Sequence, residues 1–430
     1  MQNQETGSVE KPLAQEGKPV YSRIIVSDNA PPPFDEWMKT ASQTDGDFVV
    51  ALTERILTEA ARSNVSDVHF QPEKNGMDIR FRTDGVLRRI GIAPADRIPQ
   101  IVARLKVLAD LLTYKTNISQ EGRVRAGRVP NIAKEMRIST TPTLHGERVV
   151  IRFFSEEQCY HYPDELGFPD DIQSRLINSI RRNNGAVLIT GPAGSGKTTT
   201  AYALLRELAD RSETLRSIVT LEDPVEHALD GIAQVEISSQ GDRSLGEMIK
   251  YMMRQDPEVL FVGEIRDRQT AEAAFQAVLT GHLLLTTFHA GSAVEVVGRL
   301  CELGLEPFVL RSGISCVLSQ RLVRKLCGCA ETFEKPLHLI IGKEEYNLNS
   351  YKMPKGCERC GSTGYWGRIP LAEALPLEND DVMRTLLDRN DTAALRDTAI
   401  CNGMIPLTDR AFALIESGAT SPLEIRRVFG

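Results

Sequence analysis

The stretch GPAGSGKT, residues 191–198, has the spacing of a phosphate-binding loop. It follows an apolar run and opens a segment of helical character, which is the context that this motif requires. Its glycines let backbone N–H groups turn toward a β-phosphate, and the helix N-terminus adds partial positive charge. Lys197 would reach the β- and γ-phosphates, and Thr198 would ligate Mg²⁺. The expected nucleotide contacts are Gly191, Pro192, Ala193, Gly194, Ser195, Gly196, Lys197, Thr198 and Thr199. The chain is therefore predicted to bind a nucleoside triphosphate.

Glu264 follows VLFVG, residues 259–263, a continuous apolar run typical of a buried parallel strand. In phosphate-loop ATPases an acid that directly ends such a strand usually holds magnesium. Here Gly263 takes that position, and the acid comes one residue later. A carboxylate at this place could polarise a water molecule for attack on the γ-phosphate, as a general base. The alternative is a surface glutamate paired with Arg266.

Glu222 and Asp223 end another apolar run, SIVTL at 217–221. Ligands of parallel sheets bind at the carboxyl ends of the strands, which is where both acids would lie. They could hold magnesium through water or orient the attacking water. The alternative is an acidic turn before Pro224.

His282 and His289 stand at the two ends of one apolar run, HLLLTTF at 282–288 and the residue after it. Most histidines in protein cores are only satisfied hydrogen-bond partners. His289, however, would share a sheet edge with Glu264, so it could sense the γ-phosphate. His282 would lie at the far end of the strand.

Four cysteines form two close pairs, Cys327 with Cys329 and Cys357 with Cys360. Two such pairs suit a tetrahedral zinc site, and in a reducing compartment zinc is favoured over disulfides. The second pair has the usual spacing, whereas the first is one residue short. Unligated thiols are the alternative.

Arg137, Arg148 and Arg152 alternate with apolar residues in the segment 136–152. Arginines in such a pattern are usually solvated or pair with acids of their own sheet. The alternative is that they contact phosphate oxygens at a cleft between domains or subunits, as arginine fingers do.

Composition narrows the class of protein further. The 430-residue chain has 25% charged residues, a net charge of −7 and a pI near 5.7, which argues against extensive contact with nucleic acid. No apolar run approaches the ~18 residues that a membrane span needs, and the N-terminus lacks the pattern of a secretory signal. Eight cysteines in so long a chain indicate a reducing, cytoplasmic setting.

The elements that must position these residues fall into successive segments. Residues 1–43 are polar and are expected to form a flexible tail. Residues 44–157 are predicted to form a small α+β domain. Its helix carries Phe48, Leu52 and Ile56 on one face, a hairpin turns at Asp84-Gly85, and a second helix spans about 98–113.

Residues 158–325 are predicted to form an α/β core, because short apolar runs alternate there with helical patterns. Strands are expected at 186–190, 217–221, 259–263 and 282–288. A helix at 270–281 would end with Gly281 in the C′ position. The pattern predicts a parallel sheet with helices on both sides. A cysteine-bearing subdomain at 326–368 and a helical subdomain at 369–430 would follow.

These motifs together resemble the secretion ATPase superfamily, in particular the assembly ATPases of type II secretion and type IV pili. The resemblance covers about 45–430 and rests on SDVHFQP (66–72), IRFRTDG (79–85), TPTLHGERVVIRFF (141–154), ITGPAGSGKTTT, TLEDPVEH (220–227), MRQDPEVLFVGEIRD (253–267) and TGHLLLTTFHA (280–290). The last four look like the Walker A segment, Asp box, Walker B segment and His box of that family. The resemblance implies a RecA-like core with a PAS-like N-terminal domain. A polar tail precedes it where the family has a docking domain, and Ala290-Gly291 stands where Thr-Asn is common.

The resemblance also implies a function. It implies a homohexamer on the cytoplasmic face of the inner membrane that hydrolyses ATP with Mg²⁺ and moves a polytopic platform protein, with a membrane-anchored docking protein as a further partner. It implies Glu264 as catalytic base, Glu222 near magnesium and the three arginines as phosphate contacts. The cysteines, with Zn²⁺, point to the assembly branch. The alternatives are a retraction motor, a type IV secretion ATPase, a nucleic-acid translocase and a nucleotide-binding regulator without hydrolysis; no nucleic acid is expected to bind.

Overall fold

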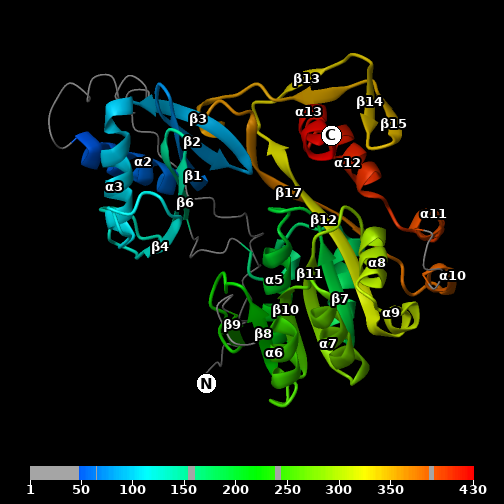
Figure 1. The fold of residues 1–430 in the computed structure, drawn as a ribbon. Helices are drawn as coiled ribbons and strands as arrows, with labels where there is room; N and C mark the ends of the chain where they lie inside the picture. Colours follow the sequence, from blue (N-terminus) through cyan, green and yellow to red (C-terminus); the bar gives the residue numbers. More distant parts are fainter. Residues whose placement is uncertain (1–47, 64, 154–159, 238–243, 387–391) are drawn as a thin grey trace, which may run out of the picture.

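The computed structural model describes residues 48–63, 65–153, 160–237, 244–386 and 392–430. The tail expected at 1–43 lies outside the described residues. Two sheets organise the described chain: an antiparallel sheet near the N-terminus and a larger, mainly parallel sheet after it (Figure 1). Within the described ranges, no helix is both long enough and apolar enough to cross a bilayer.

The first sheet has six strands in the order β3-β2-β1-β6-β5-β4, and every neighbouring pair is antiparallel. Its strands are β1 (Val65–Glu73), β2 (Gly76–Thr83), β3 (Val86–Ala93), β4 (Gln120–Val124), β5 (Met136–Thr143) and β6 (Gly146–Phe153). The helices α2 (Phe48–Arg62) and α3 (Ile98–Leu108) bury their apolar faces with the sheet in one core.

The first helix and the hairpin of this sheet confirm their predictions. Phe48, Leu52 and Ile56 of α2 are all buried, as their spacing of four residues requires. Asp84 and Gly85 have φ of +49° and +81°, the conformation of a two-residue turn that matches the twist of the flanking strands.

The helix predicted at about 98–113 is shorter, because α3 ends at Leu108. Asp110 has φ +56°, and the N–H groups of Asp110 and Leu111 donate to the carbonyl oxygens of Val107 and Lys106. This is a Schellman end, in which a left-handed residue turns the chain back over the last helical turn. The usual glycine is replaced here by an aspartate, so the end carries no obvious sequence mark.

The second sheet has seven strands in the order β17-β12-β7-β11-β10-β8-β9. All neighbours are parallel except β12 and β17. The strands are β7 (Gly185–Thr190), β8 (Ile218–Glu222), β9 (Ala233–Glu236), β10 (Val259–Glu264), β11 (Leu283–Phe288), β12 (Ile314–Leu326) and β17 (Tyr365–Ala374). The four predicted core strands are thus confirmed to within one residue at each end.

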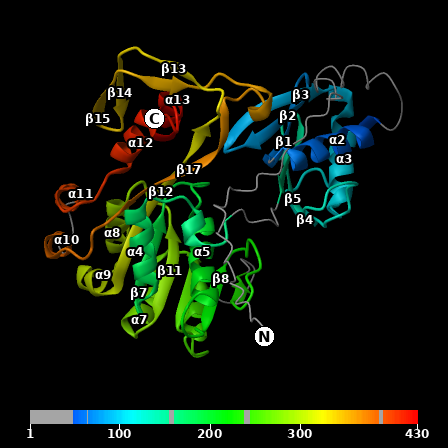
Figure 2. The ribbon, with the colours of Figure 1, turned by 180° about the vertical axis from the view of Figure 1, so that it is seen from behind.

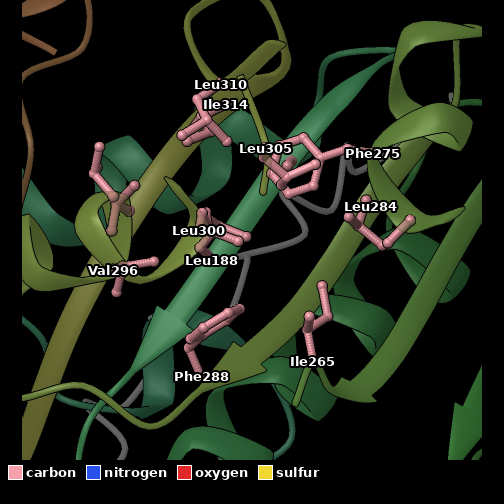
Figure 3. Close-up of a cluster of buried hydrophobic side chains, with 14 of the residues drawn as sticks. Leu188, Ile265, Phe275, Leu284, Phe288, Val296, Leu300, Leu305, Leu310 and Ile314 are labelled. Atoms are coloured by element: carbon pink, nitrogen blue, oxygen red, sulfur yellow. The ribbon is translucent and has the colours of Figure 1, made fainter. Parts of the chain in front are cut away.

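Helices cover both faces of this sheet, as predicted. One face carries α6 (Leu245–Met252), α7 (Arg268–Leu279), α8 (Ala293–Glu302) and α9 (Pro307–Gly313), and the other carries α4 (Asp170–Ile180) and α5 (Lys197–Asp210) (Figures 1 and 2). Alternate residues of β7 serve the two cores: Leu188 packs with the α7–α9 side, shown in Figure 3, and Val187 packs with the α4–α5 side. Gly281 follows α7 with φ +104°, which confirms its predicted C′ position.

The long strand β12 leaves the core and links it to the C-terminal part. Its first half pairs with β7, and its second half pairs with β17. Residues 369–374 belong to β17, so the part predicted as helical opens with a strand; the sequence hides it because Pro370 lies within it and the charged Glu373 is among its buried residues.

Between β12 and β17 lie two small two-stranded antiparallel sheets, and helices complete the chain. They are β13 (Glu331–Phe333), β14 (Leu337–Ile341), β15 (Glu344–Leu348), β16 (Tyr351–Met353), α10 (Asp380–Thr385), α11 (Thr392–Cys401), α12 (Leu407–Glu416) and α13 (Pro422–Phe429). α12 and α13 pack on β12, β14, β15 and β17 around one apolar core. At the first sheet, Arg88 donates to the Gly361 carbonyl at 3.2 Å, so the β2–β3 hairpin touches the cysteine-bearing segment.

Candidate functional site

The phosphate-binding loop connects β7 to α5 at the carboxyl edge of the second sheet. Gly191 has φ +147°, and a Cβ atom there would lie 2.2 Å from the Gln320 carbonyl oxygen, so no other residue fits. Gly194 and Gly196 have φ of +73° and +90°, again in the region that favours glycine. The loop therefore has the backbone shape that a phosphate cradle needs.

Lys197 is the first residue of α5, and its side chain lies back over the loop. The ammonium group donates to the carbonyl oxygens of Gly191 at 2.8 Å and Pro192 at 3.1 Å. Burial lowers the pKa of this amine, and the nearby Glu264 carboxylate partly offsets the shift. Lys197 and Thr198 line a pocket of about 430 Å³ at this edge of the sheet.

Gln320 braces the loop from β12, and we did not anticipate it from the sequence. Its side-chain amide donates to the Ser195 carbonyl at 2.8 Å, and its Oε1 accepts from the Thr200 hydroxyl at 3.0 Å. The side chain is buried, so these bonds satisfy it. The sequence gives little signal for it, because Gln320 stands between Ser319 and Arg321 in a strand with several polar residues, and its partner Thr200 is 120 residues away.

Glu264 owes its direction to a β-bulge at the end of β10. Val262 pairs with Thr286 and Glu264 pairs with Thr287, which leaves Gly263 as an extra residue in the strand. The Gly263 carbonyl accepts a 2.6 Å hydrogen bond from the Thr287 hydroxyl. The one-residue displacement seen in the sequence is therefore a bulge, and it places Glu264 on the wall of the pocket that Lys197 lines.

The Glu264 carboxylate binds two neighbours. Its Oε1 lies 3.3 Å from His289 Nε2, and its Oε2 accepts from Arg266 Nε and Nη2 at 2.8 and 2.6 Å. The predicted meeting of His289 with Glu264 at one edge is confirmed, and so is the pairing with Arg266 that was the alternative. His282 lies at the other end of β11, where its Nδ1 is 2.9 Å from the Ala277 carbonyl oxygen.

Glu222 is buried beside the pocket and fully hydrogen-bonded. Its Oε1 accepts from the Thr220 hydroxyl at 2.6 Å and the Gln234 amide at 3.2 Å, and its Oε2 accepts from the Tyr202 hydroxyl at 2.5 Å. Burial, together with this carboxylate, raises the pKa of Tyr202, so the phenol stays protonated and keeps donating. Glu222 and the neighbouring Asp223 both line the pocket.

The three arginines of the first sheet lie apart from this pocket. Among the described residues none of them lines it. Each contacts a side chain of its own sheet: Arg137 pairs with Glu121 at 2.5 Å, Arg148 Nη2 lies 3.2 Å from His69 Nδ1, and Arg152 donates to Asp67 at 2.9 Å. Within one chain they therefore have local partners, and a role as phosphate contacts stays a prediction.

The four cysteines meet at the ends of β12 and β17. Their sulfur atoms all lie within 4.8 Å of one another, with Cys327–Cys357 and Cys329–Cys360 at 3.9 Å and Cys357–Cys360 at 3.7 Å. Four sulfurs bound at about 2.3 Å to one zinc ion would lie about 3.8 Å apart in a tetrahedron. The short CGC pair therefore adopts a geometry that fits a metal ion. The N–H groups of Cys357 and Gly364 donate to the Cys360 sulfur, as in thiolate knuckles.

Comparison with known proteins agrees with this geometry. The family described as "Type II/IV secretion system protein" matches residues 42–427. The chain is 38% identical over 385 residues to the type II secretion system protein HxcR of Pseudomonas aeruginosa, covering 89% of this chain and 78% of that protein. It is 37% identical to the type II secretion system ATPase E of Vibrio cholerae, covering 88% of this chain and 75% of that protein.

Solved structures show the same fold. The ATPase DotB of Legionella pneumophila has a TM-score of 0.65 at 21% identity, over 88% of this chain and 95% of that one. The pilus retraction motor PilT with bound ADP has a TM-score of 0.58 at 21% identity, over 87% and 96%. The fold is thus the RecA-like phosphate-loop core with an α+β N-terminal domain, and the chain belongs to the type II/IV secretion system protein family, the secretion ATPases.

Proposed function

We propose that this chain hydrolyses ATP to drive assembly of a type II secretion pseudopilus or a type IV pilus. The observation that carries the proposal is the pocket in which the phosphate loop, Glu222, Glu264 and His289 meet. Family membership supports the secretion context, and the cysteine cluster supports the assembly branch over retraction. The acidic balance of the chain disfavours a nucleic-acid translocase.

In the proposed mechanism the loop of 191–199 binds the triphosphate, and Lys197 moves from its backbone partners to the β- and γ-phosphates. Thr198, with Glu222 acting through water, would hold Mg²⁺. The ion would neutralise the negative charge that develops on the phosphate oxygens. Glu264 takes a proton from the attacking water, since its carboxylate faces the pocket next to the loop. His289 shares that carboxylate and contacts the γ-phosphate, so it reports whether the phosphate is bound.

We also propose the setting in which this site works. The chain forms a homohexamer on the cytoplasmic face of the inner membrane, where it acts on a polytopic platform protein, with a membrane-anchored docking protein as a further partner. The four cysteines hold one structural Zn²⁺, since their sulfur spacing suits it. These parts of the proposal rest on the family resemblance and on the site geometry together.

Replacing Lys197 by alanine tests the proposed function in cells. The variant removes the charge that contacts the phosphates, so secretion through the system or piliation is expected to fall to the level of a gene deletion, with normal amounts of the protein. Secreted protein and surface pili are the measurements. Lys343→Ala, at the exposed β14–β15 turn, is the matched control and should change neither. Normal secretion and piliation in Lys197→Ala would contradict the proposal, and loss of nucleic-acid transfer alone would favour a translocase.

The arginines can be tested by mixing two inactive variants. We propose that Arg152, with Arg137 and Arg148, reaches the nucleotide of a neighbouring subunit. Chains with Arg152→Ala keep an intact phosphate loop, and chains with Lys197→Ala keep the arginines. Mixed oligomers are therefore expected to recover part of the ATP turnover that each variant alone lacks. Absence of recovery in oligomers shown to contain both chains would mean that the arginines serve only their own chain.

A further inference from the structure

Side chains bind the backbone of the segment between His289 and α8 at Ala290, Gly291 and Ala293. Thr190 accepts a hydrogen bond from the Ala290 N–H at 2.9 Å and donates to the Ala290 carbonyl at 3.2 Å. Glu295 accepts from the Gly291 N–H at 2.6 Å, which closes the start of α8 on itself. These contacts come from Thr190 at the end of β7 and from Glu295 on α8, whereas the Gly291 carbonyl and the Ala293 N–H have other partners.

Those two remaining groups are bound by side chains that also bind the C-terminal helices. Glu373, on β17, accepts from the Ala293 N–H through Oε1 at 3.0 Å and from the Leu407 N–H through Oε2 at 3.1 Å. Ala293 is the first residue of α8 and Leu407 is the first residue of α12. One carboxylate, 1% exposed, therefore caps the N-termini of two helices from different parts of the chain.

Arg321, on β12, makes a second link of the same kind. Its Nη2 lies 3.5 Å from the Gly291 carbonyl oxygen, and its Nη1 donates to the Val428 carbonyl of α13 at 2.9 Å. Its guanidinium also stacks over the Phe429 ring, with 4.9 Å between Cζ and the ring centroid. Since Glu373 and Arg321 lie on paired strands, both links pass through the β12–β17 pair that carries the C-terminal part.

A buried carboxylate that caps two helix ends is costly unless both donors stay in place. Movement of the 289–293 segment would leave Glu373 with one partner, and movement of α12 would do the same from the other side. The two helix ends are therefore favoured to move together or not at all. This is a physical reason for coupling between the pocket and the C-terminal helices, since His289 is at the start of the same segment and contacts Glu264.

We propose that Glu373 and Arg321 are positioning residues that hold His289 for turnover and link the nucleotide pocket to α12 and α13. The proposal rests on the proposed function, in which His289 faces the γ-phosphate. Neither residue touches the pocket; both act through the backbone of 289–293. Nucleotide binding at the sheet edge thereby reaches α12 and α13, which pack on the second half of β12.

The variant Glu373→Gln keeps the size of the side chain but offers an NH₂ group to one of the two backbone donors. The turnover number for ATP is expected to fall about 10- to 100-fold through misplacement of His289, while the KM for ATP stays near that of the wild type. The KM is spared because the phosphate loop is untouched. Glu416→Gln removes the same charge from an exposed position of α12 and should leave both constants unchanged.

Hydrogen exchange of the full-length oligomer separates this role from a merely structural one. In the wild type, a non-hydrolysable ATP analogue is expected to slow amide exchange at 191–198, at 289–293, at 407–411 and at 425–429. In Glu373→Gln the slowing at 191–198 should remain and that at 407–411 should disappear. Arg321→Lys, on a half-buried side chain, keeps the charge but cannot span both carbonyl groups, and it should lose the response at 425–429. It provides the test if Glu373→Gln does not fold.

Two results would overturn the linkage. One is a wild type in which the analogue slows exchange at 191–198 but not at 407–411. The other is a pair of variants that keep both the turnover number and the response of α12 and α13. If no segment responds to the analogue, 191–198 included, the proposed function itself fails and the linkage falls with it.

Discussion

Glu264→Gln will lower the ATP turnover number at least ~100-fold, while the dissociation constant for ATP stays close to that of the wild type. The bulge should be unaffected, because the Thr287 hydroxyl donates to the Gly263 carbonyl and not to the side chain at position 264. The phosphate loop also stays intact. The variant therefore removes the group that can take a proton from the attacking water, together with the negative charge that Arg266 and His289 contact. Turnover and equilibrium binding of ATP, measured on the same preparation, are the readouts.

A matched control lies at the other end of the same strand. Glu258 precedes β10, its side chain is 55% exposed, and it accepts from the Ser217 N–H. Glu258→Gln removes the same charge and should keep turnover within about twofold, as surface substitutions usually do. If Glu264→Gln turned over ATP like the wild type, the ion pair with Arg266 would be the main role of Glu264, and another residue would have to be the base.

The purified protein is expected to contain about one zinc ion per chain, because four thiolates make one closed tetrahedral site. Cys360→Ser removes one sulfur and the acceptor of two backbone N–H groups, so the zinc content should fall well below one and residues 327–364 should become sensitive to protease. Metal analysis and limited proteolysis measure the two effects. The core should be affected less, since its apolar clusters do not include the cysteines of the site.

Cys401 supplies the control for this experiment. It is exposed at the end of α11 and is not a member of the cluster of four sulfurs. Cys401→Ser should therefore keep the full zinc content and the same protease pattern as the wild type. A folded, active preparation that contained no metal would show that the four thiols lie together for another reason, and the zinc assignment would be withdrawn.

The parts of the fold that the sequence predicts well are those with local causes. The glycines of 191–196, the apolar runs of the core strands and the Asp84-Gly85 turn each carry their own conformational reason within a few residues. The place of Glu264 is predicted for the same reason, because a glycine between an apolar run and an acid is visible without any tertiary contact. The pocket then follows from the rule that parallel strands share a carboxyl edge.

The parts that escaped prediction depend on partners distant in the sequence. Gln320 matters because β12 lies beside β7, and Glu373 matters because α8 and α12 begin next to β17. Neither is part of a motif, and the sequence does not indicate which backbone groups a buried polar side chain will bind. The end of α3 is different: it is local, but an aspartate takes the left-handed position that glycine usually holds, so the hydrophobic pattern alone extends the helix too far.

Successive side chains of β12 lie on opposite faces of the strand and bind different parts of the protein. Gln320 faces the phosphate loop, and Arg321, on the opposite side of the strand, faces Gly291 and α13. Three residues further on, Arg324 binds Glu424 of α13, and the strand ends one residue before the first cysteine of the cluster. Insertion or deletion of a single residue before Gln320 would move this and every later side chain of the strand to the opposite face, away from its present partners. A change of length in β12 is therefore expected to be more damaging than a change of one side chain. The register of this strand matters to the ATP site as much as the phosphate loop that Gln320 supports.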